Sequence, residues 1–287
     1  MRHAVLADKL TKEYAGRKVV SELDLRVEKG ELFGFLGPNG AGKTTTIRML
    51  TTLTKPTSGR VEINGFDVAA DTRNLKASFG IVQQHLSLNR ELTVRENLEL
   101  HARLHHIGRR ERKERIDELL DYVEMTEKQD QLIDRISEGM KRRTMIARAL
   151  IHRPKLIFLD EPTVGLDAQT RRKVWDLIRA MNSDGATVFL TTHYIEEAEA
   201  LCKRVGIIHQ GNMIALGKPE DLCRDVGSIA VEARRKGDGT SYQYFQDRAS
   251  AAEYVQTLPL NFENVLIRES NLEDVFIELT GRKVGGG

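Results

Sequence analysis

The sequence has very few cysteines and no long apolar run. Cys202 and Cys223 are the only cysteines in 287 residues, too few for a disulfide framework or a cysteine-based zinc site within one chain. No run of about 18 apolar residues is present, which argues against a membrane-spanning helix. The first ten residues lack a signal-peptide pattern, because Asp8 and Lys9 interrupt their short apolar stretch. We therefore expect reduced thiols and a location on the cytoplasmic side.

An excess of one charge is also missing. The 44 Lys and Arg residues balance 42 Asp and Glu residues, so the net charge of +2 gives no general attraction to nucleic acid or anionic lipid. The most basic segment, "GRRERKERIDELL", interleaves acids with its bases and has no aromatic stacking pattern. It is typical of a solvated helix face, and we predict no nucleic-acid partner.

Strand and helix patterns alternate along much of the chain. The first 36 residues alternate as strands do, and no repeat of 20 to 50 residues is found. Five short apolar runs are candidates for buried strands: "ELFGFLG", "FGIVQQ", "KLIFLDE", "ATVFLTTH" and "RVGIIHQ". Most are followed by a helical pattern, and this order predicts an α/β fold in which helices cover a parallel sheet.

Two segments depart from this alternation. Residues 93–149 show helical spacing without an intervening strand, which predicts an inserted helical subdomain. Its periodic apolar positions are Leu98, Leu100, Leu104, Ile116, Leu119, Leu120 and Val123. After "LGKPEDL" a second set of short strand and helix patterns begins. We place a domain boundary near Cys223, with a main domain over 1–222 and a small accessory domain over 223–287.

The segment "GPNGAGKTT" follows a predicted strand and opens a predicted helix, as a phosphate-binding loop does. Its glycines let successive N–H groups converge on phosphate oxygens, and the helix start adds its dipole. Lys43 is placed to reach the outer phosphates, and the Thr44 hydroxyl can ligate Mg²⁺. A plain glycine-rich turn would not need all of these elements. The loop therefore predicts a nucleoside triphosphate as ligand.

The segment "LIFLDEP" puts two carboxylates at the end of a buried strand, where parallel sheets bind ligands. Successive side chains of a strand diverge, so Asp160 and Glu161 are expected to do different work. We assign Asp160 to the Mg²⁺ shell and Glu161 to the attacking water. The structural alternative is that one acid caps the next turn.

The segment "RISEGMKRR" opens a basic, apolar-striped helix. Ser137 and Gly139 suit a helix start that offers free N–H groups to an anion, and Lys141, Arg142 and Arg143 add positive charge. Glu138 does not fit an anion site. An acid is, however, locally favourable in the first turn of a helix.

Five motifs follow one another along the chain: "GPNGAGKTT", "SEGM" with "RRTMIARAL", "LIFLDEP", "GLD" and "TTH". In this order they resemble the ATP-binding subunit of an ABC transporter over roughly residues 4–220. The segment "ARALIHRPKLIFLDEPTVGLD" and the tail with "NLEDVFIELTG" are most similar to those of drug, antibiotic and polysaccharide exporter ATPases. The resemblance implies a P-loop NTPase core with a mainly parallel sheet, an N-terminal antiparallel β-subdomain, the helical insertion and a small C-terminal α+β appendage. It also implies ATP and Mg²⁺ as cofactors.

The resemblance assigns most roles residue by residue. ATP contacts are implied for Tyr14, Gly37, Pro38, Asn39, Gly40, Ala41, Gly42, Lys43, Thr44, Thr45, Ser137, Gly139 and Asp167. Thr44, Gln84 and Asp160 are implied metal ligands, and Glu161, His193 and Gln84 the catalytic set.

Several of these assignments have an alternative. Tyr14 matches the aromatic residue that stacks on adenine, but it is also a plausible strand-edge tyrosine. Gln83 precedes Gln84, so the metal-linked glutamine is a choice of one residue. We prefer Gln84, because its spacing to "LTVRENL" fits the family pattern. His193 follows a strand beside the carboxylates and can orient the water near Glu161; a packed histidine is the alternative. Asp167 can serve the loop that crosses between two copies and cap a helix as well.

The resemblance makes "SEGM" the signature motif, which binds the γ-phosphate held by another copy. Two chains would then form two identical sandwiched sites, with Glu138 pointing away from the phosphate. A separate membrane permease is the implied second partner, docked on "HLSLNRELTVRENL" and the adjacent helical surface. The chain is therefore expected as a peripheral protein on the cytoplasmic face of the membrane, powering export.

Two alternative functions do not involve transport. A soluble ABC-type ATPase acting on DNA needs a long coiled-coil insertion, but only 51 positions separate Gln84 from Arg135 (135 minus 84). A nucleotide-dependent assembly or sensing module without transport stays open. His101 and His105 have a zinc-compatible spacing of four, but no "HExxH" pattern surrounds them and no third ligand is evident, so no metal site is predicted there.

Overall fold

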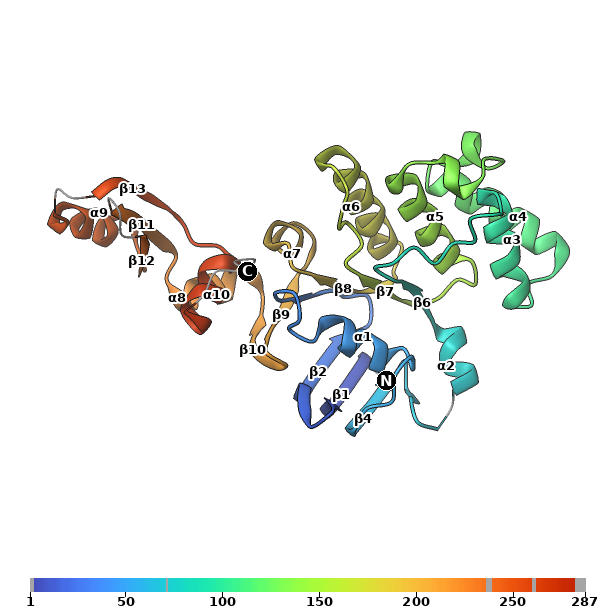
Figure 1. The fold of residues 1–287 in the computed structure, drawn as a ribbon, viewed down its shortest axis with the longest axis horizontal. Helices are drawn as coiled ribbons and strands as arrows, with labels where there is room; N and C mark the ends of the chain where they lie inside the picture. The colour runs from blue at the N-terminus through green and yellow to red at the C-terminus, as the bar shows by residue number, and fades with distance from the viewer. Residues whose placement is uncertain (1–2, 71, 236–238, 260–261, 282–287) are drawn as a thin grey trace.

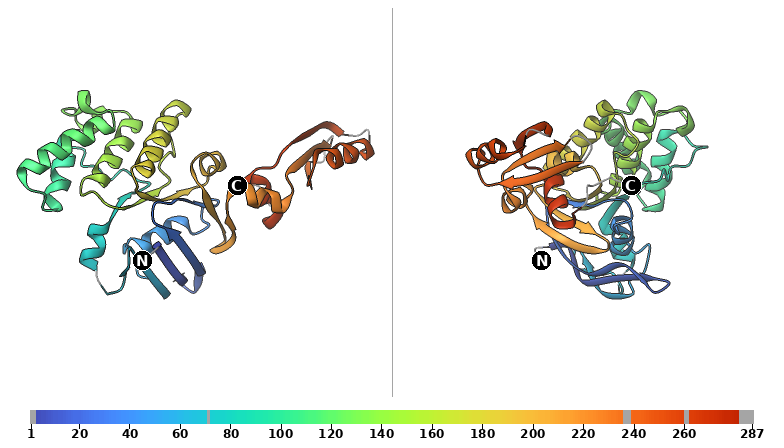
Figure 2. Two further views of the ribbon diagram at one scale, coloured as in Figure 1. Left: turned by 180° about the vertical axis from the view of Figure 1, so that it is seen from behind. Right: turned by 60° about the vertical axis from the view of Figure 1, so that its left-hand side comes forward.

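The computed structural model describes residues 3–70, 72–235, 239–259 and 262–281. Its main body holds two sheets and a group of helices, and the C-terminal part extends from one side (Figures 1 and 2). Among the described residues, no helix is long and apolar enough to cross a membrane.

An antiparallel sheet forms the N-terminal side of the body. Its strand order is β2-β1-β4-β5. The strands are β1 (His3–Tyr14), β2 (Arg17–Glu28), β4 (Ser58–Ile63) and β5 (Phe66–Asp67). Alternating apolar residues such as Val5, Leu23 and Val61 bury one face of this sheet, as the two-residue periodicity of the first 36 residues predicts.

A six-stranded sheet with the order β10-β9-β3-β8-β7-β6 forms the centre. Its strands are β3 (Leu32–Leu36), β6 (Phe79–Val82), β7 (Leu156–Asp160), β8 (Thr187–Thr192), β9 (Arg204–His209) and β10 (Asn212–Gly217). All neighbours pair in parallel except β10, which is antiparallel to β9. Every residue of β3, β7 and β8 is buried, because both faces are covered. The five predicted strands all form.

The two faces of the central sheet belong to different apolar cores. Phe33, Phe158 and Phe189 pack with α1 (Lys43–Leu50), which lies between the two sheets (Figure 1). Alternate residues such as Leu159 and Leu190 pack into the other core with the helices of the opposite face. These helices include α6 (Ala168–Ser183) and α7 (Ile195–Leu201), while α2 (Thr72–Ser78) leads into β6.

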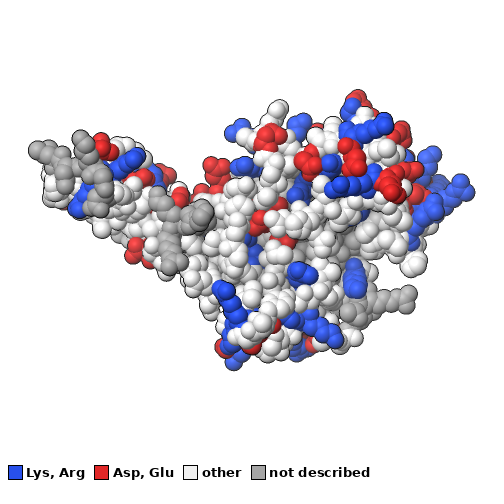
Figure 3. Space-filling model, in the orientation of Figure 1, with Lys and Arg blue, Asp and Glu red and all other residues white. Residues whose placement is uncertain are grey.

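The inserted segment folds as a helical subdomain, as predicted. It contains α3 (Val94–Leu104), α4 (Arg109–Tyr122), η1 (Thr126–Lys128), η2 (Ile133–Arg135) and α5 (Glu138–Leu150). Five of the seven periodic apolar positions are buried, but the Leu100 and Leu104 side chains are 44% and 66% exposed. Acidic and basic side chains are mixed over the face of the subdomain that Figure 3 shows, and Arg110 pairs with Glu114 at 3.2 Å.

The C-terminal segment contains α8 (Pro219–Val226), β11 (Ile229–Arg235), β12 (Thr240–Phe245), α9 (Arg248–Thr257), β13 (Phe262–Glu269) and α10 (Leu272–Thr280). The sheet order is β12-β11-β13. The predicted boundary at Cys223 falls inside α8. Helix α10 returns to the body: Leu272, Val275 and Phe276 join the core on the helix-covered face of the central sheet, and the Leu272 N–H donates to Glu199 at 2.8 Å. Any boundary must therefore leave α10 packed on the main domain.

Candidate ATP-hydrolysis site

The phosphate loop lies between β3 and α1, where the sequence predicts it. Gly42 ends the loop with φ 112°, and α1 begins without a side-chain cap, so its first N–H groups are available to an anion. Gly37 is tightly confined, because an added Cβ would lie 2.3 Å from the Ile208 carbonyl oxygen. This crowding, together with the positive φ, explains glycine at both positions.

Lys43 is the buried cation of the site, with its side chain 4% exposed. Its ammonium donates to the carbonyl oxygens of Gly37 and Pro38 at 2.8 and 3.0 Å. A third contact is the ion pair with Glu161, whose Oε1 lies 3.1 Å from Nζ. Phosphate oxygens entering the loop would therefore meet a lysine already aimed into it.

The two carboxylates at the end of β7 diverge, as strand geometry predicts. Asp160 accepts from the hydroxyls of Thr191 at 2.6 Å and Thr44 at 3.3 Å. Burial raises the pKa of Asp160, and the two hydroxyls oppose that shift. Glu161 has a positive φ of 48°, and its N–H donates to the carbonyl oxygen of Thr191 at 3.1 Å. The Glu161 side chain points to Lys43, whereas the Asp160 side chain points to Thr44 and Thr191.

Gln84 and His193 complete the surroundings of Glu161. The Gln84 amide donates to Oε2 at 3.3 Å, and Nδ1 of His193 lies 3.3 Å from the same oxygen. Gln83 instead belongs to the lining of a different cavity. Between the two glutamines left open by the sequence, Gln84 is therefore the one that reaches the carboxylate.

A cavity of about 490 Å³ unites these groups. Its lining consists of Val19, Asn39, Gly40, Gly42, Lys43, Thr44, Thr45, Gln84, Glu161, Val164 and His193. Ala41 is buried within the loop. Tyr14 lies outside this lining: the residue is 48% exposed at the end of β1, with the Lys12 ammonium 4.9 Å from the ring centroid.

The signature segment also lies outside the cavity. Ser137 is the N-cap of α5 and accepts from the Met140 N–H at 3.3 Å. Glu138 is 60% exposed and pairs with Lys141 at 2.7 Å. Gly139 is packed against α6, since an added Cβ would lie 2.2 Å from the Thr170 methyl group. Within one chain, this segment therefore contributes no residue to the lining of the cavity.

The positive charge expected at this helix start is largely engaged within the chain. Lys141 pairs with Glu138, and Arg143 donates to the Val123 carbonyl oxygen at 2.9 Å. Arg142 points inward and is 5% exposed. The charge that these three residues add is therefore held by acceptors within the chain.

Asp167 is the N-cap of α6, as its position before a helix predicts. It accepts from the Thr170 N–H at 2.9 Å and from the Thr170 hydroxyl at 2.6 Å. The hydroxyl is the main cause of its lowered pKa. Because Thr170 also meets Gly139, the cap connects the starts of α5 and α6.

Arg142 is a functional candidate whose role the sequence analysis missed. Its guanidinium donates to the carbonyl oxygens of Gln83 and Gln84 at 2.9 and 3.2 Å. It thereby holds the segment that presents the Gln84 amide to Glu161. A buried arginine in a run of three cations has no distinguishing spacing, so only the fold reveals this contact.

Replacing Arg142 by methionine should therefore disturb catalysis without touching a reacting group. We expect the rate of ATP hydrolysis to fall about tenfold, since small displacements of positioning groups are costly, and the free energy of unfolding to fall by about 2 kcal/mol. Steady-state hydrolysis and urea unfolding measure both. Arg143→Met, which frees the Val123 carbonyl instead, should keep the parent rate; equal losses of rate in both variants would contradict a role for Arg142 at Gln84.

Glu197 is a second missed residue. Its fully buried carboxylate accepts from the Thr163 hydroxyl at 2.7 Å and the Trp175 indole at 2.8 Å. Burial raises its pKa. Glu197 lies on α7, which follows His193, and its carboxylate binds the turn between Glu161 and α6. It thereby fixes the segments that carry His193 and Glu161 relative to each other.

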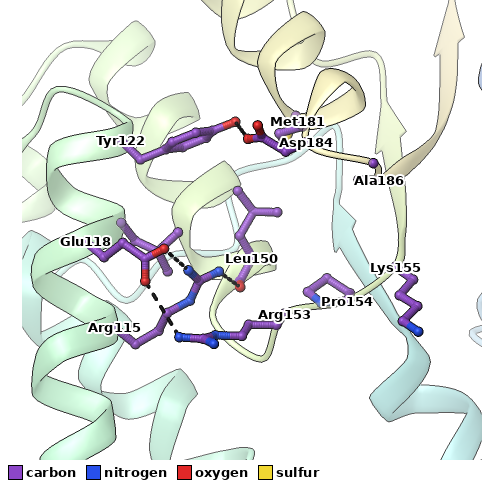
Figure 4. A pocket seen from close by; sticks show the side chains of 12 residues that line it. Arg115, Glu118, Tyr122, Leu150, Arg153, Pro154, Lys155, Met181, Asp184 and Ala186 are labelled. Carbon is purple, nitrogen blue, oxygen red and sulfur yellow. Dashed lines mark hydrogen bonds and ion pairs between the residues drawn. The ribbon is translucent and has the colours of Figure 1, made fainter. Parts of the chain in front are cut away.

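A second cavity, of about 540 Å³, lies between α4 and the ends of α5 and α6 (Figure 4). Arg115 pairs with Glu118 at 2.7 Å and donates to the Leu150 carbonyl oxygen at 2.8 Å. Tyr122 donates to Asp184 at 3.2 Å. None of the predicted site residues lines this cavity. Its polar contacts connect helices and assemble no catalytic group.

Comparison with known proteins identifies the class of this fold and site. The ABC transporter family model matches residues 20–164. A daunorubicin resistance ATP-binding protein of Streptomyces coeruleorubidus is 36% identical over 97% of this chain and 96% of its own length. A Nod factor export ATP-binding protein I of Rhizobium johnstonii is 38% identical over 96% of this chain and 94% of its own. The chain belongs to the ABC transporter family.

More specifically, it is an ABC transporter ATPase. A dimeric ATP-binding cassette solved in a post-hydrolysis state with ADP and Pi superposes with a TM-score of 0.69 and 30% identity, over 75% of this chain and 98% of that chain. The ATP-binding subunit of another ABC transporter gives a TM-score of 0.70 and 29% identity, over 77% and 92%. The predicted family, enzyme class and fold are confirmed, and the roles of single residues stay predictions.

Proposed function

We propose that this chain hydrolyses MgATP to power export through a separate membrane permease, from the cytoplasmic face of the membrane. The observation that carries the catalytic part is Glu161, held at the end of β7 within reach of Lys43, Gln84 and His193 in one cavity. The relatives named for drug resistance and Nod factor export support the direction of transport.

Hydrolysis would begin with an exchange of partners at Lys43. Without nucleotide the Lys43 ammonium is paired with Glu161 at 3.1 Å. A γ-phosphate would take over the ammonium, because a doubly charged group with several acceptor oxygens is the stronger partner. Glu161 would then be free to accept a proton from the attacking water. Its hydrogen bond from Gln84 would keep the carboxylate oriented during the exchange.

The residues present fit Mg²⁺. Asp160 and the Thr44 hydroxyl offer hard oxygen donors only 3.3 Å apart, and oxygen is the ligand atom that Mg²⁺ prefers. Thr44, Asp160 and Gln84 would hold the ion, which would neutralise charge on the phosphates. Thr191, which donates to Asp160 at 2.6 Å, would orient that carboxylate.

A second copy of the chain would complete each site. Ser137, Gly139 and Asp167 do not line the cavity of their own chain. Exposed Ser137 at the start of α5 suits a γ-phosphate held by a partner. The dimeric ADP-bound cassette that this chain resembles supports such an arrangement. Glu138, paired with Lys141, would stay out of the phosphate site.

The permease would dock in an apolar groove of about 460 Å³ beside the segment that follows Gln84. The groove is lined from α3, β6, the end of α5 and the turn after α1, and it includes Leu53 and Leu104, which are 50% and 66% exposed. Exposed leucines around a groove are typical of a surface that buries a partner. Ser87 connects the groove to the Gln84 segment through Arg148.

Purification of the tagged chain from solubilised membranes of its own cells tests this function. We expect a multi-span permease to copurify, and Leu104→Glu to reduce its recovery about tenfold, because a charge replaces apolar contact. Leu100→Glu, an exposed change on the same helix outside the groove lining, is the control. Absence of any multi-span partner with the parent chain would instead favour the assembly or sensing module.

A further inference from the structure

Three histidines from two segments meet on the wall of this groove. His101 and His105 lie one turn apart at the end of α3, and His152 lies in the turn after α5. The rings of His105 and His152 are stacked with centroids 3.9 Å apart, and the centroids of His101 and His105 are 4.8 Å apart. One ring nitrogen from each residue lies within 4.8 Å of the other two. His152 is the third potential ligand that the sequence spacing did not reveal.

His152 has the hydrogen-bond pattern of a metal-binding imidazole. Its Nε2 lies 3.0 Å from the Phe79 carbonyl oxygen, and a carbonyl only accepts, so Nε2 carries the proton. Nδ1 is then an acceptor, and it is buried without a hydrogen-bond partner among the described residues. Metal-binding histidines commonly donate one ring N–H to a carbonyl while the other nitrogen binds the ion.

The electrostatics of the groove select the kind of ion. Burial lowers the pKa of His101 to about 3 and that of His152 to about 4, and it also lowers the pKa of His105. The imidazoles are therefore in the neutral form that binds metal. Among the residues that the structure describes, no carboxylate lines the groove, which disfavours Mg²⁺ and Ca²⁺ and favours ions that bind imidazole.

The described part of the chain also places Lys76 and Arg148 in the lining of the groove. Arg148 is turned to Ser87, with one guanidinium nitrogen 2.5 Å from the carbonyl oxygen and the other 2.5 Å from the hydroxyl. It also lowers the pKa of His101. This charge opposes a divalent ion, so the affinity depends on all three imidazoles acting together.

We propose that His101, His105 and His152 form a three-histidine site for a transition-metal ion, with Zn²⁺ as the expected occupant. Three neutral imidazoles with one open position are a frequent zinc ligand set. Zn–N bonds of about 2.0–2.1 Å require the nitrogens to approach one another by up to about 1.5 Å and the stacked rings to turn until their lone pairs converge. The bound ion would tie the end of α3 to the turn after α5, across the groove wall.

Zn²⁺ titration of the full chain, free of any histidine tag and without nucleotide, tests this site. Competition with a chromogenic chelator should give one Zn²⁺ per chain, and Co²⁺ should give the visible absorption of a tetrahedral site. His101→Ala, His105→Ala and His152→Ala should each weaken binding at least about tenfold, equivalent to about 1.4 kcal/mol. His106→Ala, an exposed neighbour outside the cluster, should bind as the parent does.

Thermal unfolding with and without Zn²⁺ guards against variants that fail to fold. Zn²⁺ should raise the midpoint of the parent and of His106→Ala, and it should leave that of His152→Ala unchanged while the metal-free midpoints remain close. Substoichiometric binding to the parent would overturn the site, as would equal Zn²⁺ affinity in the parent and His152→Ala. These readouts need neither ATP hydrolysis nor a permease, so they stand apart from the proposed function.

Discussion

Replacing Glu161 by glutamine should lower the rate of ATP hydrolysis by about 10²- to 10⁴-fold while ATP stays bound, because a general base is lost from the site. Glutamine keeps the shape of the side chain and can still meet Gln84, whose amide lies 3.3 Å from the carboxylate. It cannot form the ion pair that holds Lys43 at 3.1 Å. Lys43 should therefore be freer to bind phosphate, and ATP affinity should be equal to or higher than that of the parent.

Single-turnover hydrolysis, nucleotide binding and size-exclusion chromatography with ATP measure these effects separately. We expect the Glu161→Gln variant to accumulate as an ATP-bound dimer. If the variant hydrolyses ATP at the parent rate, Glu161 is not the general base. His193 would be the next candidate, because its Nδ1 lies 3.3 Å from the Glu161 carboxylate.

Glu138→Gln is the matched control for this experiment. Glu138 is 60% exposed and paired with Lys141, so neutralising it should leave hydrolysis and dimerisation close to the parent values. A carboxylate facing the partner's phosphate at about 4 Å would instead repel it by about 4 kcal/mol at an effective dielectric of about 20. More than a tenfold gain in ATP-driven dimerisation by this control would show that Glu138 does oppose ATP.

The sequence predicted the parts of this protein that depend on local pattern. The apolar runs became the five parallel strands, because burial on both faces requires continuous apolar residues. The phosphate loop was predictable as well, because backbone crowding at Gly37 and the positive φ at Gly42 both require glycine. The divergence of Asp160 and Glu161 followed from the alternation of side chains on a strand.

What could not be predicted depends on contacts between distant segments. Arg142 bonds a loop 58 and 59 positions away, and His152 meets His105 although the two belong to different elements. Helical periodicity identified Leu104 as an apolar position, but it could not say that this position lies beside a groove. Helix α10 was expected in an accessory domain, yet its apolar face packs with the main body, because amphipathicity does not specify which surface covers it.

Replacing Lys43 by methionine should have a large effect on stability as well as on ATP binding. Lys43 and Glu161 are 4% and 6% exposed, and removing one partner of a buried pair commonly costs about 3–5 kcal/mol, because the other charge is left without its counterion. Urea unfolding without nucleotide should therefore show a loss of that size. Binding of MgATP should weaken about 100-fold, since a charged hydrogen bond to the phosphates is lost.

The double variant Lys43→Met/Glu161→Gln separates these two effects. Neutralising Glu161 removes the uncompensated charge, so most of the lost stability should return, whereas the phosphates still lack their cation and ATP binding should stay weak. Equal stability of the parent and Lys43→Met would show that the pair does not stabilise the nucleotide-free chain. Recovery of ATP affinity in the double variant would mean that Lys43 acts on ATP only by neutralising Glu161, and direct contact with the phosphates would be disproved.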